Sequence, residues 1–113
     1  MSENAGRTLR RFPRYQIDIR VRLSTPSSGT DSAVYGRGTD VGEGGMAIFA
    51  AIECRIGDSI EVHFPVLSSP QPMKAKGIVR NRNGFRYGIE FVGLSADDRK
   101  EVVRLCEFLT PGE

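Results

Sequence analysis

The clearest pattern along the chain is a strict alternation of apolar and polar side chains that begins at Tyr15. Every second residue from Tyr15 to Leu23 is apolar, and the residues between them are polar or charged. Because successive side chains of a strand point to opposite faces, this segment is predicted to be a half-buried β-strand. The same alternation predicts strands at residues 60–64 and 85–91. On the buried face of the last strand we expect Phe85, Tyr87, Ile89 and Phe91.

Shorter apolar segments between turn signals complete the predicted strands. These weaker candidates are residues 33–39, 46–50 and 73–80. Loops or turns are predicted where Gly, Pro, Ser and Asn gather, at residues 25–32, 67–72 and 81–84. The glycine-rich segment 40–45 is expected to be a loop that joins two antiparallel strands, with glycine supplying positive φ.

The end of the chain changes to a helical period. Ser95 is placed to cap a helix, and Asp97 and Asp98 follow in the first turn, where the helix dipole favours acidic groups. Apolar residues then recur at helical spacing, at Val102, Val103, Leu105, Cys106 and Leu109. A Pro-Gly pair at 111–112 ends the helix. Six short strands followed by one amphipathic helix predict a small β-barrel or sandwich that the helix covers.

The length and the charge distribution restrict this picture further. A chain of 113 residues is one domain with one modest core. The net charge of +2 is mild, but residues 1–22 carry six arginines against Glu3 and Asp18, a local balance of +4. Such asymmetry indicates an anionic partner at one place. We therefore divide the chain into a flexible basic arm at residues 1–14 and a barrel with its helix at residues 15–110.

Enzyme chemistry has little support in the sequence, and we expect a protein without catalytic activity. The single histidine, His63, falls on the outward face of a predicted strand, and neither Cys54 nor Cys106 lies near it in zinc-ligand spacing. A formal GxGxxA match at residues 42–47 is followed by a strand, whereas dinucleotide binding requires a helix there. Two buried free thiols are expected, with a disulfide left open.

The expected compartment is the cytoplasm. No run of apolar residues approaches the length needed to span a bilayer, and the N-terminal residues lack the apolar centre of a signal peptide. The two cysteines do not form the framework typical of a small secreted domain.

Two short motifs resemble those of the PilZ domain family. Residues 10–14, RRFPR, match its RxxxR motif through Arg10 and Arg14, and Arg7 with Arg11 offers an alternative register. Residues 40–45, DVGEGG, match (D/N)xSxxG except that Gly42 replaces the serine. The resemblance covers roughly residues 7–109 and implies a six-stranded antiparallel barrel with a C-terminal helix.

The resemblance also implies a ligand, cyclic diguanylate (c-di-GMP), which is a bacterial second messenger. Arg10 and Arg14, with Arg11 beside them, would bind phosphates and guanine edges, because a guanidinium pairs bidentately with both. Asp40 would accept guanine N–H groups, and Gly45 would permit close approach of the ligand. At Gly42 the missing hydroxyl removes one hydrogen bond, about 0.5–1.5 kcal/mol. No other cofactor and no metal is expected.

The predicted function is a ligand-dependent switch on an unidentified effector protein. The alternative is a degenerate member of the family that binds no nucleotide and acts as a protein-interaction adaptor. Binding to single-stranded nucleic acid ranks last, because it requires exposed aromatic residues on a basic strand face, and Phe85, Tyr87 and Phe91 are expected in the core.

Overall fold

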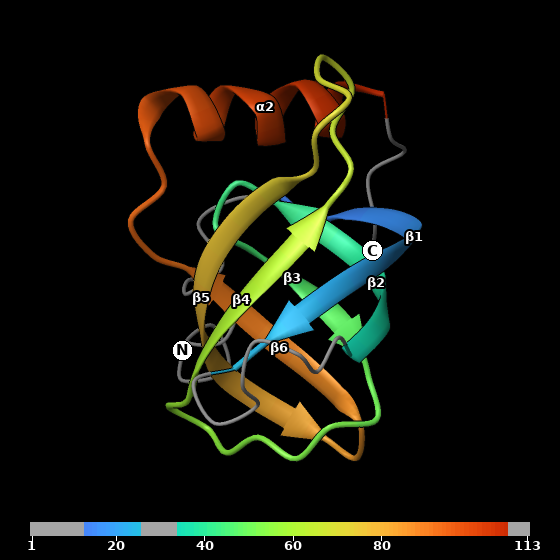
Figure 1. The fold of residues 1–113 in the computed structure, drawn as a ribbon, viewed down its shortest axis with the longest axis vertical. Coiled ribbons are helices and arrows are strands. Elements are labelled where there is room, and N and C mark those ends of the chain that lie inside the picture. Colours follow the sequence, from blue (N-terminus) through green and yellow to red (C-terminus); the bar gives the residue numbers. More distant parts are fainter. Residues whose placement is uncertain (1–12, 26–33, 109–113) are drawn as a thin grey trace, which may run out of the picture.

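The strands close into a six-stranded antiparallel barrel (Figure 1). The computed structural model describes residues 13–25 and 34–108, and every structural statement below refers to these residues. Around the barrel the strand order is β1-β2-β3-β6-β5-β4, and β4 pairs with β1 to complete the ring. The strands are β1 (Tyr15–Ser24), β2 (Val34–Gly42), β3 (Gly45–Phe49), β4 (Ser59–Phe64), β5 (Met73–Asn83) and β6 (Arg86–Phe91). The predicted barrel is therefore confirmed.

β2 and β3 run further into segment 40–45 than the sequence predicted. The segment 40–45 is largely strand, because β2 continues to Gly42 and β3 starts at Gly45. Only residues 43–44 remain as the turn, so the prediction of a six-residue loop was wrong. The prediction of positive φ was also wrong here, because the described residues with positive φ are the glycines at 57, 84 and 93. The glycines at 42 and 45 serve close packing of the backbone.

The hairpin between β5 and β6 forms as predicted, but its boundaries differ. β5 extends to Asn83, and Gly84 takes the left-handed conformation with φ of 65° that the tight turn requires. Phe85 therefore lies in the turn and is exposed, so its predicted place on the buried face was wrong. The alternation of β6 starts one residue later, at Arg86.

The core fills the inside of the barrel with the inward side chains of all six strands. Tyr15, Ile17 and Ile19 are only partly buried and pack against it. His63 faces outward as predicted but is mostly covered, and its Nε2 lies 3.1 Å from the Glu61 carboxylate. The strand residues of the core cluster are Val21, Leu23, Val41, Met46, Ile48, Ile60, Val62, Phe64, Met73, Ala75, Val79, Tyr87, Ile89 and Phe91.

The helix α2 (Ala96–Glu107) lies across one end of the barrel (Figure 1). Its N-cap is as predicted, with the Ser95 hydroxyl accepting a hydrogen bond of 3.0 Å from the Asp98 N–H. The buried face consists of Val102, Leu105 and Cys106, whereas Val103 is only half-buried. Both cysteines are buried and free, which confirms the predicted thiols.

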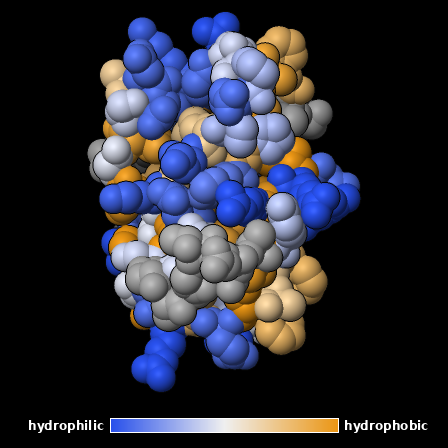
Figure 2. All heavy atoms as spheres, in the orientation of Figure 1, coloured by the Kyte–Doolittle hydropathy of each residue, from blue (hydrophilic) through white to orange (hydrophobic). Residues whose placement is uncertain are grey.

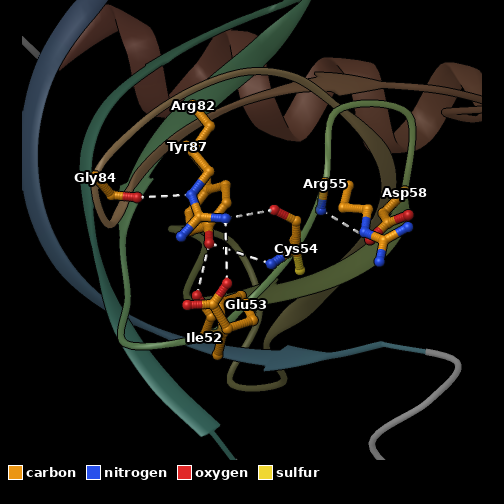
Figure 3. Close-up of polar contacts among 8 residues, drawn as sticks. All are labelled: Ile52, Glu53, Cys54, Arg55, Asp58, Arg82, Gly84 and Tyr87. Atoms are coloured by element: carbon orange, nitrogen blue, oxygen red, sulfur yellow. Dashed lines mark hydrogen bonds and ion pairs between the residues drawn. The ribbon is translucent and has the colours of Figure 1, made fainter.

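A polar network at the other side of the core fixes the segment that precedes β4 (Figure 3). The Tyr87 hydroxyl donates a hydrogen bond of 2.6 Å to the Ile52 carbonyl and accepts one of 3.2 Å from the Cys54 N–H. The Arg82 guanidinium lies 5.2 Å from the Tyr87 ring centroid and donates to the carbonyls of Gly84 and Cys54. We call these five residues the Arg82–Tyr87 cluster. Every polar group named in it has a partner.

The surface of the barrel is mixed in character. In the view of Figure 2 hydrophilic side chains gather across the middle of the molecule, with hydrophobic side chains visible between them. Among the described residues, no helix has the length and apolar character needed to cross a membrane.

Candidate functional site

Asp40 lies near the end of β2 with its side chain on the outside of the barrel. It pairs with Gln16 of β1 and with Ala47 of β3. Both ladders are irregular beside it, with register shifts between Gln16 and Ile19 and between Gly38 and Asp40. Such bulges bend a strand and redirect a side chain, and they are frequent next to functional sites. The Asp40 carboxylate is accordingly held at a fixed place on a rigid strand, and not in a loop.

Two arginines approach this carboxylate from different sides. Arg14 Nη1 lies 3.9 Å from Asp40 Oδ1, and Arg86 Nη2 lies 3.6 Å from Oδ2. Arg14 precedes β1, whereas Arg86 opens β6, so residues 72 positions apart in sequence meet at one acid. The separations are ion-pair distances but exceed those of direct N–H···O hydrogen bonds. The three charges therefore form a loose cluster.

The Asp40 carboxylate is short of hydrogen bonds. Its side chain is 23% exposed, yet Oδ1 is buried and has no hydrogen-bond partner among the described residues. A buried acceptor without a partner destabilises a protein by about 1–3 kcal/mol, and more when it is charged. The carboxylate can therefore accept hydrogen bonds from donors outside the described residues, whether from water or from a ligand.

Small residues surround Asp40 on the neighbouring strands. Across the sheet the register runs from Asp40 to Ala47, then to Gly88, and then to Asn81. A Cβ atom on Gly88 would lie 2.6 Å from the Asn81 carboxamide, so the Asn81 side chain leans over this glycine. Asn81 is therefore a further polar side chain on this part of the surface, in addition to Asp40 and its two arginines.

Gly42, which departs from the family motif, has a packing role. A Cβ atom at this position would lie 2.4 Å from the Pro13 carbonyl oxygen, far inside contact distance. Only glycine thus lets the Pro13–Arg14 backbone lie directly against β2. Because Arg14 follows Pro13, the same close approach brings its guanidinium towards Asp40.

Gly45 is also explained by backbone packing. A Cβ atom there would lie 2.0 Å from the Ile89 carbonyl oxygen of β6. Its predicted role, close approach of a ligand, is not needed to account for a glycine at this position. Arg10 and Arg11 lie outside the described residues, so of the predicted arginines only Arg14 is placed.

Sequence reasoning missed Arg86 altogether. The residue stands outside both motifs, and it reaches Asp40 only because β3 lies between β2 and β6 in the ring. The one available signal was that Arg86 is the outward residue at the start of the strongest alternating segment. Its nearest acid depends on strand order, which the alternation does not specify.

Comparison with known proteins places this architecture in a family. A family model described as PilZ domain matches residues 8–108, and the comparison with curated proteins found no match. The PilZ domain of YcgR from Escherichia coli, solved with c-di-GMP, is 15% identical with a TM-score of 0.70; the similarity covers 88% of this chain and 90% of that one.

Two further solved structures share the fold. The PilZ domain of CeSA from a cellulose-synthesizing bacterium is 15% identical with a TM-score of 0.64, over 84% of this chain and 95% of that one. The motility inhibitor MotI/DgrA of Bacillus subtilis is 14% identical with a TM-score of 0.68, over 88% of this chain and 49% of that one, so the chain spans about half of MotI. The family match, the closed barrel and the single C-terminal helix agree, and the chain belongs to the PilZ domain family of non-catalytic receptor domains.

Proposed function

We propose that this domain binds c-di-GMP at the Asp40 site and acts as a ligand-dependent switch on an effector protein. PilZ domains typically bind c-di-GMP, and the PilZ domain of YcgR was solved with it. The observation that carries the proposal is the Asp40 carboxylate, which has a buried oxygen without a hydrogen-bond partner among the described residues and two arginines within 4 Å.

The chemistry of the site suits a cyclic dinucleotide. An ionised carboxylate accepts hydrogen bonds only, so Asp40 pairs with the N–H donors on a guanine edge. Arginine forms bidentate hydrogen bonds with phosphate and with guanine O6 and N7. In the proposed complex Arg14 and Arg10 bind the phosphates and guanine edges, with Arg11 next to them. Gly42 and Gly45 have no side chains, so β2 and β3 present only backbone at the edge of the site.

The switch follows from the positive charge of residues 1–14. Arginines that are close in sequence repel one another, and a dianionic ligand neutralises them. Pro13 and Arg14 already lie against β2. In this proposal the ligand holds the part of the arm that precedes Pro13 against the barrel, and this changes the surface that an effector protein meets. The strands do not rearrange, because each is paired on both sides.

Gly42 supports the competing function, an adaptor that has lost nucleotide binding. The motif hydroxyl is missing, which removes a hydrogen bond of about 0.5–1.5 kcal/mol, or up to roughly tenfold in affinity. Contacts to charged groups contribute about 1.5–3 kcal/mol each, so the loss at Gly42 is smaller than what Asp40 and one arginine supply. The balance favours weakened but retained binding.

Calorimetry and NMR test the proposal on the isolated chain. We expect c-di-GMP to bind and to shift the amide signals of residues 7–14 and 40–45 together with Arg86. Arg14→Ala should weaken binding by more than tenfold, since it removes a charge-assisted contact. Arg55→Ala, a change of the same kind at an exposed residue that precedes β4, is the control. No shift and no heat at saturating nucleotide would refute nucleotide binding and support the adaptor function.

A further inference from the structure

A second group of arginines lies on the outside of the barrel and borders the Asp40 site, since Phe49 beside it is the cross-strand neighbour of Arg86. Arg20 and Arg22 of β1 point outward, and so do Tyr35 and Arg37 of β2 and Phe49 of β3. The register sets Arg20 opposite Arg37, Arg37 opposite Phe49, and Arg22 opposite Tyr35. These five side chains form one continuous surface over three adjacent strands, which we call the arginine–aromatic face.

The aromatic residues of this face are unusually open to solvent. Tyr35 is 49% exposed and Phe49 is 55% exposed, although both occupy regular strand positions. The Arg20 guanidinium lies 4.1 Å from the Tyr35 ring centroid, so the tyrosine ring already holds one cation on its face. Tyrosine and arginine dominate the binding energy of protein interfaces, whereas scattered surface residues seldom combine both.

The charge of the face is only partly balanced. Arg37 Nε lies 2.8 Å from the Asp18 carboxylate, but within the described chain no carboxylate forms an ion pair with Arg20 or Arg22. Arg20 and Arg37 are direct cross-strand neighbours, an arrangement that is destabilising for like charges unless an acid is present. The face therefore carries an excess of positive charge that an acidic partner would neutralise.

A groove continues this face towards β4. A cavity of about 300 Å³ lies beside Arg20, Arg22 and Tyr35, and its far wall comes from His63 and from the prolines of the β4–β5 loop. Proline rings and the Tyr35 ring supply its apolar surface, and the polar side chains that line it are Arg20, Arg22, His63, Ser69 and Gln71. Such a groove accommodates an apolar side chain next to an acidic one.

We propose that the arginine–aromatic face is the docking surface for an acidic segment of a protein partner that carries apolar side chains. The proposal goes beyond nucleotide binding and does not depend on it. Carboxylates of the partner pair with Arg20 and Arg22, and its apolar side chains pack on Tyr35 and Phe49 and in the groove.

This face has the exposed aromatic residues on a basic strand surface that binding of single-stranded nucleic acid requires, contrary to the expectation from sequence. A single-stranded nucleic acid nevertheless fits this surface less well than an acidic peptide. Asp18 and Glu61 interrupt the positive charge, and Asp18 is 75% exposed on the same side of β1 as Arg20. A continuous phosphate backbone would meet these carboxylates, whereas discrete acidic side chains pair with individual arginines. An experiment with both kinds of probe therefore distinguishes a protein partner from a nucleic acid.

Fluorescence anisotropy with defined probes tests the proposal. The probe is a labelled synthetic peptide in which glutamates alternate with leucine and phenylalanine; the comparison probes are the same peptide with glutamine for glutamate, and oligothymidylate. We expect the acidic peptide to bind to the full chain. Changing both Arg20→Glu and Arg22→Glu should weaken binding by at least about tenfold, and Tyr35→Ser by a smaller factor.

The matched control changes Arg55→Glu and Lys100→Glu. It has the same net charge as the Arg20→Glu, Arg22→Glu variant, but its substitutions lie away from the face. We expect that variant to lose less than about threefold, since exposed charges far from a contact act weakly. In the unaltered chain, amide shifts on adding the peptide should lie in β1, β2 and β3 and beside the groove, at the end of β4 and in the β4–β5 loop. This measurement does not depend on any variant folding. Absence of peptide binding, equal loss in the control, shifts elsewhere, or tighter binding of oligothymidylate would each overturn the proposal.

Discussion

Two arginine sites of this barrel differ in how completely their polar groups are satisfied. In the Arg82–Tyr87 cluster the guanidinium donates to two carbonyls, and the tyrosine hydroxyl both donates and accepts (Figure 3). At Asp40 two guanidinium groups stand 3.6 and 3.9 Å away, and one carboxylate oxygen has no hydrogen-bond partner in the described part of the chain. The first site has the features of a structural element, whereas the second has those of a binding site.

The comparison leads to opposite expectations for stability and for binding. Disturbing a satisfied buried network leaves polar groups without partners and destabilises the fold. Disturbing a loose surface cluster removes little from the fold but deprives a ligand of its contacts. The predictions below test this contrast from the largest expected effect to the smallest.

Asp40→Asn should have the largest effect on nucleotide affinity. Asparagine keeps the shape but removes the charge that attracts guanine N–H donors and the arginines, so we expect c-di-GMP affinity to fall on the order of 100-fold. The melting temperature should not fall, because the lost charge is poorly satisfied in the free protein. Titration calorimetry and a thermal melt measure both, with Asp18→Asn as the control that keeps full affinity.

Tyr87→Phe should have the largest effect on stability. The change leaves the Ile52 carbonyl and the Cys54 N–H without their partner. We expect this to lower the free energy of unfolding by about 2 kcal/mol. For a domain of this size that corresponds to a fall in Tm of roughly 10 °C. Affinity for c-di-GMP, measured well below the new Tm, should stay within a factor of two. A large loss of affinity at full folding would show that the two sites are coupled.

Gly42→Ala and Gly42→Ser separate the steric role of this position from its hydroxyl. Alanine should push the Pro13–Arg14 segment away from β2 and weaken c-di-GMP binding by about fivefold, or about 1 kcal/mol. Serine should lie between alanine and the unchanged chain, because its hydroxyl restores a hydrogen bond of about 0.5–1.5 kcal/mol. Tighter binding of Gly42→Ser than of the unchanged chain would mean that the segment moves aside in the complex.

Thiol labelling gives the smallest but most local readout. Burial, with a smaller contribution from Asp58, raises the pKa of Cys54, and burial with Glu43 raises the pKa of Cys106 to about 11. Since the thiolate reacts, both should label slowly at pH 8. Tyr87→Phe should accelerate labelling of Cys54, whereas Asp40→Asn should not. Mass spectrometry of the labelled peptides distinguishes the two thiols.

The raised pKa of Cys106 also makes the free energy of unfolding depend on pH. A folded-state pKa raised from 9.0 to about 11 means that folding favours the neutral thiol. This contribution is fully present below pH 9 and is lost as the pH rises through about 11. The free energy of unfolding should therefore decline over this range in the unchanged chain, and less in a Cys106→Ala variant.

Much of the fold was accessible from the sequence because its pattern is local. The alternation in β1, β4 and β6 and the N-cap at Ser95 each depend on residues that are close together along the chain. The prediction of a loop at residues 40–45 was wrong because glycine indicates either a turn or close packing of backbones, and only the neighbouring strands decide between them. The prediction for Phe85 was wrong because the two-residue turn consists of Gly84 and Phe85, one position later than the Asn83-Gly84 signal indicates.

The candidate site was predicted only in part. The residue types and the family motifs pointed to Arg14 and Asp40, and the two side chains do meet. Arg86 was not predictable, since its distance from Asp40 depends on the ring order that places β3 between their strands. The contact of Gly42 with Pro13 likewise joins segments whose spacing no sequence pattern fixes.

The pairing of β4 with β1 has a consequence for how the domain behaves at high concentration. The closed ring has no strand whose whole edge is unpaired, although β4 pairs with only residues 22–24 of β1. A second molecule therefore finds only a short template on which to add a strand. Self-association through the backbone, the route to fibrils and swapped dimers in open sheets, is restricted accordingly in the folded barrel.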